Sequence, residues 1–115
     1  MYKQLQVYRR ARLVADTAYA CVDGWEPFDR WTVGQQLVRA ADSIGANIAE
    51  AYGRGSSGDR RRFIVIARGS ALELEHWTET ALARDLDLPR SLRAQSGEIS
   101  RMLHAMARRM GREAP

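Results

Sequence analysis

The feature that most constrains the fold is an apolar stripe that runs through residues 63–81. Its members are spaced alternately by four and three residues: Phe63, Ala67, Ser70, Leu74, Trp77 and Ala81. This spacing places all of them on one face of an α-helix, because the helix repeats every ~3.6 residues. A helix with one long apolar face needs other elements to cover it. The rest of the chain must supply that cover.

Two of the covering helices precede the stripe. Apolar residues at helical spacing predict a first helix over about residues 3–23, and Pro27 prevents its simple continuation. A second helix is predicted to begin at Thr32, in a capping box with Gln35, and to end before Gly53. The buried positions expected on these helices are Tyr8, Ala11, Ala15, Ala18 and Val22 on the first, and Leu37, Ala41, Ile44, Ile48 and Ala51 or Tyr52 on the second.

The helix that carries the long stripe and one further helix complete the pattern. Ser56 or Ser57 is expected to cap the start of the third helix, and Asp59 lies in its first turn, where the helix dipole favours an acid. Asp87 or Leu88 is expected to cap the fourth helix, with Pro89 near its first turn. Its expected apolar side consists of Leu92, Ile99, Met102, Met106 and Met110.

The connections between these segments are short, and no segment shows the sustained alternation of a strand. The sequence therefore predicts an all-α fold, an antiparallel up-down-up-down four-helix bundle that forms a single domain over residues 1–115. Small residues on the second helix allow either close helix packing inside the bundle or a flat face for a neighbouring subunit. Trp25, Phe28 and Trp31 crowd the first connection, where they cap the bundle end or anchor an interface.

The charge of the chain is positive and arranged in blocks. Eighteen basic residues, all but one of them arginine, oppose fourteen acidic ones, for a formal net charge of +4. Residues 54–69 and residues 90–115 each carry a net charge of +4, whereas residues 70–89 carry −4. Arginine suits phosphate because its planar guanidinium presents a fork of donors. The two basic blocks therefore point to nucleic acid as a partner.

The sequence also predicts where the protein works. Apolar residues never run for the ~20 positions that a membrane span requires, and the start of the chain lacks the apolar core of an export signal. A single cysteine, Cys21, excludes an internal disulfide. We expect a cytoplasmic protein with no membrane partner.

Residues 53–58 have the GxGxxG spacing of dinucleotide-binding loops. That fingerprint requires a preceding strand, and here a helix is predicted instead, which disfavours a dinucleotide site. The segment is either a helix C-cap followed by a flexible loop or, because amides at a helix start attract phosphate, a nucleic-acid or anion contact. The candidate nucleic-acid-binding residues are Arg54, Arg60, Arg61 and Arg62 around this loop, with Arg108, Arg109 and Arg112 near the C-terminus.

Other chemistry has less support in the sequence. Glu73 and His76 have the Glu-x-x-His spacing of di-iron bundles, but the other ligands of such a site are missing, so no metal or other cofactor is expected. No histidine can be assigned to a nucleophile, and we expect no enzymatic activity. The polar residues that we interpret as a network fixing the register of the second and third helices are Asn47, Glu50, Arg68 and Glu73. A catalytic role for this group in a concave pocket is the lesser alternative.

Two segments of the chain are familiar as a pair, residues 39–53 (RAADSIGANIAEAYG) and residues 63–75 (FIVIARGSALELE). Together they resemble the bacterial four-helix-bundle family first found in intervening sequences of 23S ribosomal RNA genes. The same family includes Avd, the accessory variability determinant of diversity-generating retroelements. The resemblance covers nearly the whole chain. It departs from the family at Ala51, where glycine is common.

The resemblance implies more than the residues show by themselves. It implies a homopentameric ring with a basic surface that contacts nucleic acid, whether RNA, DNA or their hybrid. In the Avd branch it implies assistance to a reverse transcriptase during mutagenic retrohoming. In the ribosomal branch it implies a four-helix-bundle scaffold with a structural or regulatory role and no nucleic-acid activity of its own. The basic blocks favour the Avd-like branch.

Overall fold

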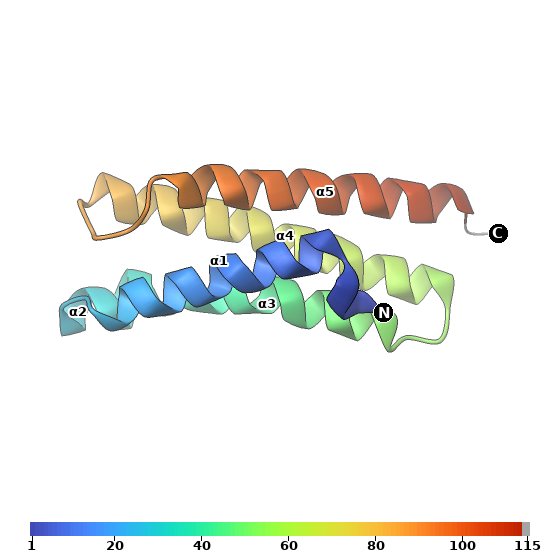
Figure 1. The fold of residues 1–115 in the computed structure, drawn as a ribbon, viewed down its shortest axis with the longest axis horizontal. Coiled ribbons are helices and arrows are strands. Elements are labelled where there is room, and N and C mark those ends of the chain that lie inside the picture. The colour runs from blue at the N-terminus through green and yellow to red at the C-terminus, as the bar shows by residue number, and fades with distance from the viewer. Residues whose placement is uncertain (114–115) are drawn as a thin grey trace.

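The computed structural model describes residues 1–113, and over this range the chain is helical throughout and contains no strand. After a short 3₁₀ turn, η1 (Tyr2–Gln4), four long helices follow: α1 (Gln6–Asp23), α3 (Gln35–Tyr52), α4 (Ser57–Ala83) and α5 (Ser91–Glu113). They lie side by side in a rod of 50 × 21 × 21 Å (Figure 1). The predicted all-α four-helix architecture is therefore confirmed, and none of these described helices is long and apolar enough to span a membrane.

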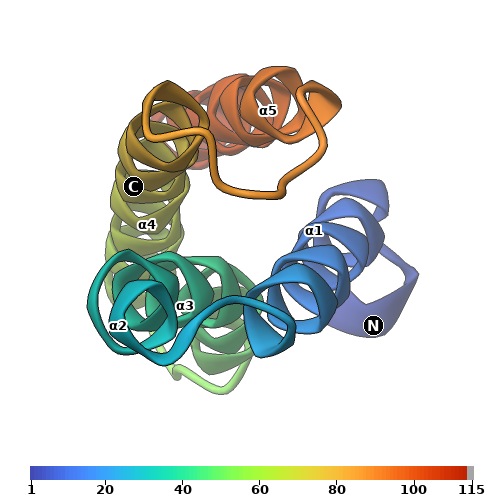
Figure 2. The same cartoon turned by 90° about the vertical axis from the view of Figure 1, so that its left-hand side faces the viewer.

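The helices are arranged around the core in chain order. Viewed along the rod, α1 lies beside α3, α3 beside α4, and α4 beside α5 (Figure 2). The helix α4 packs extensively on both of its neighbours, whereas α1 and α5 touch more sparsely. The long helix α4 is therefore the central element, as the length of its apolar stripe suggests.

Most of the predicted core is buried. The stripe positions Ala67, Leu74 and Ala81 of α4 are fully buried, and Ile44 and Ile48 of α3 lie opposite them in the same core. Small polar residues also enter this core, because each hydroxyl can donate to a carbonyl of its own helix. The buried polar side chains are Ser70, Thr78, Ser96 and Ser100.

The second helix begins earlier than predicted. A short helix α2 (Pro27–Asp29) leads through a π-helical turn, η2 (Arg30–Gly34), directly into α3, so that Thr32 lies inside a helical run. The hydroxyl of Thr32 donates to the carbonyl of Phe28 at 2.7 Å and caps nothing. The predicted capping box is wrong because Pro27, which suits the first helical position, already starts the helix.

Gly34 explains how this turn fits against α1. A Cβ placed on Gly34 would lie 2.6 Å from Cγ1 of Val22 and 3.1 Å from the carbonyl oxygen of Asp29. Real Cβ atoms do not approach other atoms this closely, so only glycine allows the contact. The start of the second helical run is therefore fixed by close packing on α1.

The apolar side of α5 is rotated relative to the prediction. The helix begins at Ser91, later than a cap at Asp87 or Leu88 would place it, and its methionines at 102, 106 and 110 are only partly buried. The fully or nearly fully buried positions are Leu92, Ser96, Ile99, Ser100, Leu103 and Ala107. The helix buries its small residues because they let α5 approach α4, which leaves the flexible methionines at the edge.

Of the three aromatic residues in and after the first connection, one is buried and two are exposed. Trp25 is 7% exposed, and its indole Nε1 donates to the carbonyl of Asp87 in the α4–α5 connection at 2.9 Å. Phe28 and Trp31 are 78% and 68% exposed. Trp25 therefore closes this end of the bundle, while its two neighbours present aromatic rings to the outside.

Candidate nucleic-acid interface

The first basic block meets the C-terminal part of the second at one end of the rod. The α3–α4 connection and the last turns of α5 lie at the same end (Figure 1). Arg61, in the first turns of α4, donates through Nε to the carbonyl of Ala107 in α5 at 2.9 Å. Its guanidinium also lies against Gly111, where an added Cβ would come within 3.0 Å of Nε. Arg61 thus joins two segments 46 residues apart in the chain. We call this end of the rod the basic end, and its arginines are Arg54, Arg60, Arg61, Arg62, Arg108, Arg109 and Arg112.

The glycine-rich segment is a helix end followed by a helix start. Gly53 is the C-cap of α3, and Ser56 is the N-cap of α4, where its Oγ accepts from the backbone N–H of Asp59 at 3.1 Å. The predicted cap at Ser56 is confirmed. Since α3 and not a strand precedes these glycines, the structural requirement of a dinucleotide-binding loop is not met.

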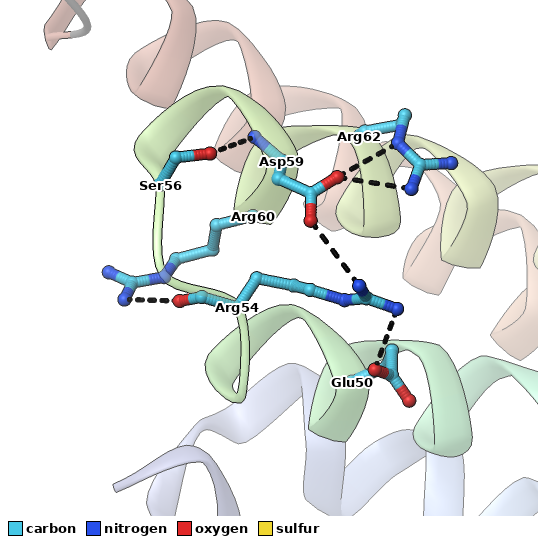
Figure 3. A network of polar contacts seen from close by, with 6 residues as sticks. All are labelled: Glu50, Arg54, Ser56, Asp59, Arg60 and Arg62. Atoms are coloured by element: carbon cyan, nitrogen blue, oxygen red, sulfur yellow. Dashed lines mark hydrogen bonds and ion pairs between the residues drawn. The ribbon is translucent and has the colours of Figure 1, made fainter.

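Arg54 is engaged by acids on both sides of the connection. Its Nη2 lies 2.9 Å from Oε2 of Glu50, one turn earlier in α3, and its Nη1 lies 3.5 Å from Oδ2 of Asp59 in α4 (Figure 3). Its guanidinium carbon also lies 4.3 Å from the centre of the Phe63 ring, within the range of a cation–π contact. Arg54 therefore ties the end of α3 to the start of α4.

Arg62 is held by the same acid and the same ring. Its Nε and Nη2 atoms both lie 3.0 Å from Oδ1 of Asp59 (Figure 3). Its guanidinium carbon lies 4.5 Å from the centre of the Phe63 ring. A single carboxylate, Asp59, thus serves two arginines that come from different sides of the loop.

Arg60 is directed back toward the connection. Its Nη2 donates to the carbonyl of Arg54 at 3.4 Å, and its guanidinium carbon lies 5.8 Å from the centre of the Tyr52 ring (Figure 3). The Nε atoms of Arg54 and Arg60 are buried and have no hydrogen-bond partner among the described residues. The four loop arginines are therefore largely occupied with the protein itself.

The C-terminal arginines differ from those of the loop. Arg108, Arg109 and Arg112 are exposed on α5, and none forms an ion pair with a residue in the range 1–112, over which the structure describes the side chains. They are the candidates that can meet a phosphate without first losing a protein partner. The structure thus divides the predicted site into an engaged half and an open half.

The four residues of the predicted polar network do not bond to one another in the part of the chain that the structure describes. Asn47 donates to the Ser43 carbonyl at 2.8 Å on its own helix, and Glu50 pairs with Arg54. Glu73 accepts from Nε1 of Trp77 at 3.2 Å, also on its own helix. The Nε of Arg68 is buried without a partner. Asn47 and Glu73 bond within their own helices and Glu50 bonds to the α3–α4 connection, so no hydrogen bond or ion pair among residues 1–112 joins these four side chains across α3 and α4.

Sequence reasoning missed the acids and the ring that engage the loop arginines. Glu50 and Arg54 are four residues apart, and Asp59 and Arg62 are three apart, spacings at which opposite charges pair on a helix. Those ion pairs could therefore have been predicted from the sequence. The contact of Arg61 with Ala107 depends on how α4 and α5 pack, and no local pattern signals it. Among the described residues no cluster of three or more His, Cys, Asp or Glu side chains could hold a metal ion.

Comparison with known proteins places this architecture in a family. A crystal structure of a protein with unknown function from the S23 ribosomal protein family of Bacteroides thetaiotaomicron superimposes with a TM-score of 0.75 at 27% sequence identity. The match covers 88% of this chain and 97% of that one. No curated protein matches the chain. The family model for the 23S rRNA-intervening sequence protein matches residues 3–105. The chain therefore belongs to the 23S rRNA-intervening sequence protein family.

Proposed function

We propose that the basic end binds the phosphate backbone of nucleic acid and that the protein is a non-enzymatic accessory protein. The observation that carries this proposal is the meeting of the loop arginines with the C-terminal arginines, far apart in the chain, at one end of the rod. Clustered arginines bind nucleic acid because neutralising phosphates releases condensed counterions. Arg108, Arg109 and Arg112 make the first contacts, since they pair with no acid among residues 1–112. RNA, DNA and their hybrid all offer this backbone.

We also propose that the protein assembles into a homopentameric ring. The outer face of α4 exposes Val65, Ile66 and Leu72, and Gly69 on the same helix has open space around it. A groove of about 320 Å³ between α1 and α3 is floored by small residues such as Ala41 and Gly45. A contact between two different surfaces is heterologous, and it closes a ring when the rotation between copies permits. Five chains of +4 would carry a formal +20, so that weak phosphate contacts add up by avidity.

The resemblance to Avd supports a finer proposal, in which this ring assists a reverse transcriptase in the cytoplasm during mutagenic retrohoming. The second candidate is a scaffold of the ribosomal intervening-sequence type with no nucleic-acid activity of its own. The engagement of Arg54 and Arg62 by acids favours this second candidate, because it removes charge from the loop. A reverse-transcriptase gene beside this one favours the first candidate, and a location within a ribosomal RNA operon favours the second.

The test is binding to labelled RNA, DNA and RNA–DNA hybrid across a salt series. Replacing Arg108 and Arg109 by alanine should make the dependence of log affinity on log salt shallower by about 1 per arginine. The matched control replaces Arg84 and Arg90, two exposed arginines at the other end of the rod, and should leave the slope unchanged. A third variant replaces Arg60, Arg61 and Arg62 by alanine.

An equal decrease of the salt slope in the Arg108/Arg109 variant and in the Arg84/Arg90 variant would contradict a localised interface. Undetectable binding at low salt would contradict the nucleic-acid proposal as a whole. Native mass spectrometry of each variant gives the subunit number, and any value other than five contradicts the proposed ring. The same spectra show whether the arginine variants keep their assembly.

A further inference from the structure

We propose that Asp59 acts as a built-in competitor of nucleic-acid phosphate and restrains the loop arginines until a phosphate backbone displaces it. This inference rests on the proposed function and adds to it a means by which the affinity of the basic end is set. It assigns a negative role to a residue of the interface: the acid lowers binding rather than contributing to it.

The geometry singles out Asp59 from the other acids of the chain. Its two carboxylate oxygens face different arginines, Oδ1 toward Arg62 at 3.0 Å and Oδ2 toward Arg54 at 3.5 Å (Figure 3). An ion pair that only supported α4 would join residues of that helix, as the pair with Arg62 does. The second pair reaches back across the connection to Arg54. One carboxylate thereby neutralises charge on both sides of the loop, as a bridging phosphate would.

The exposure of these groups makes exchange feasible. The side chain of Asp59 is 32% exposed, those of Arg54 and Arg62 are 38% and 59% exposed, and ion pairs of such exposure are weak and easily screened. A phosphate oxygen can take the place of the carboxylate and keep the same donors of Arg62 in use. The contacts of both guanidinium groups with the Phe63 ring do not involve the acid, so the exchange itself replaces only the ion pairs with Asp59.

Arg62 is the arginine that this acid controls most completely. Arg54 keeps a second acid, Glu50, at 2.9 Å when Asp59 is removed, whereas the ion pair of Arg62 is with Asp59. Neutralising Asp59 should therefore release Arg62 fully and Arg54 in part. The expected gain is about one additional phosphate contact per chain.

The experiment compares Asp59→Asn with the wild type in two measurements on the full-length chain. The first measures modification of each arginine by phenylglyoxal, read by mass spectrometry without any nucleic acid. Arg62 should react several-fold faster in Asp59→Asn. The second measures binding of single-stranded RNA across a salt series, where affinity at low salt should rise on the order of three- to tenfold and the salt slope should steepen by about 1.

Two matched variants separate this effect from simpler ones. Glu79→Gln removes one negative charge and frees Arg93, which it holds at 2.7 Å, and should change RNA affinity less than twofold. Ser56→Ala removes the N-cap of α4 without changing charge and should not raise affinity. If Glu79→Gln raises affinity as much as Asp59→Asn does, net charge is responsible and the inference is wrong. If Ser56→Ala does so, fraying of α4 is responsible and the inference is again wrong.

The remaining outcomes distinguish this inference from the proposed function. Unchanged reactivity of Arg62, or unchanged RNA affinity in Asp59→Asn while the wild type binds, overturns the role of Asp59 and leaves the nucleic-acid interface standing. No RNA binding by any variant, with faster modification of Arg62, overturns the proposed function and the competition with it, and leaves only the restraint of Arg62 by Asp59.

Discussion

The two ends of the rod are held together by different physical means. At one end, which we call the aromatic end, Trp25 is buried and its indole joins the connection after α1 to the connection after α4. At the basic end, partly exposed arginines form ion pairs, ring contacts and single hydrogen bonds to backbone carbonyls. The aromatic end is therefore closed by burial, and the basic end by polar contacts that water can replace.

This difference indicates which end of the molecule can exchange its own contacts for contacts with a partner. Burial of a large side chain is lost only by opening the core, whereas an exposed ion pair can be traded for another at little cost. The basic end is thus suited to reversible binding, and the aromatic end maintains the alignment of the helices.

The largest effect is expected at the aromatic end. Replacing Trp25 by alanine should lower the free energy of unfolding by about 3–5 kcal/mol, because it leaves a cavity and an unpaired Asp87 carbonyl. Replacing Trp31, which is 68% exposed, should change it by no more than about 0.5 kcal/mol. Denaturant unfolding of both variants checks this, and a similar loss in the two would mean that the buried indole does not hold this end.

Replacing two glycines by alanine compares a closely packed position with a position on the open surface. Gly34→Ala should destabilise the protein by about 1–3 kcal/mol, since the new Cβ would clash with Val22. Gly69→Ala, in the middle of α4 with open space around it, should stabilise an isolated chain by up to about 1 kcal/mol through helix propensity. Thermal unfolding of the two variants gives the signs. If Gly69→Ala instead weakens assembly in native mass spectrometry, a neighbouring subunit covers this face of α4.

At the basic end, the cap of α4 should contribute less than Trp25 does. Ser56→Ala should cost about 1 kcal/mol, because the N–H of Asp59 loses its acceptor but remains accessible to water. Hydrogen exchange should show the loss in the first turn of α4 and not at the aromatic end. A cost as large as that of Trp25→Ala would contradict the view that the basic end is held by replaceable contacts.

The smallest effect concerns Cys21, near the end of α1. Burial, with a smaller contribution from the charge of Asp87, raises the pKa of the Cys21 thiol. The neutral thiol is therefore favoured in the folded chain, and its contribution to stability is present at low pH and is lost as the pH rises through the raised pKa. Alkylation at mildly alkaline pH should be slower in the folded chain than in urea. Equal rates would show that α1 exposes this thiol.

The fold was predictable where one physical signal dominates. The apolar spacing of α4 and α3 identified buried residues such as Leu74 and Ile44, because a long amphipathic helix leaves little choice of face. In α5 the same reasoning selected methionines, since hydropathy ranks Met106 above Ser96. The core instead takes the smaller residue, because the distance between α4 and α5 limits side-chain size. Such a preference arises from packing and cannot be read from one helix.

The sequence predicted which residues make up the candidate site, but not which contacts they form. The sequence identified the arginines, but it gave no sign that Arg61 donates to Ala107 across the bundle. It also placed Asn47 in a network between helices, whereas Asn47 bonds to Ser43 on its own helix. Hydrogen bonds within one helix are favoured over bonds between helices in such cases, because they form without a second helix having to be in register. Phosphate binding by the seven arginines stays a prediction.

The grouping of the loop arginines with Arg108, Arg109 and Arg112 at one tip of a 50 Å rod gives the molecule a positive pole at that tip. The screening length at physiological salt is about 8 Å, far shorter than the rod, so a polyanion near α2 does not sense the arginines in the last turns of α5. A polyanion that binds the arginines must therefore approach the rod at its basic end. If subunits stand parallel in a ring, all their positive poles lie on one rim, and the opposite rim, with its exposed aromatic rings, stays free for a different kind of partner.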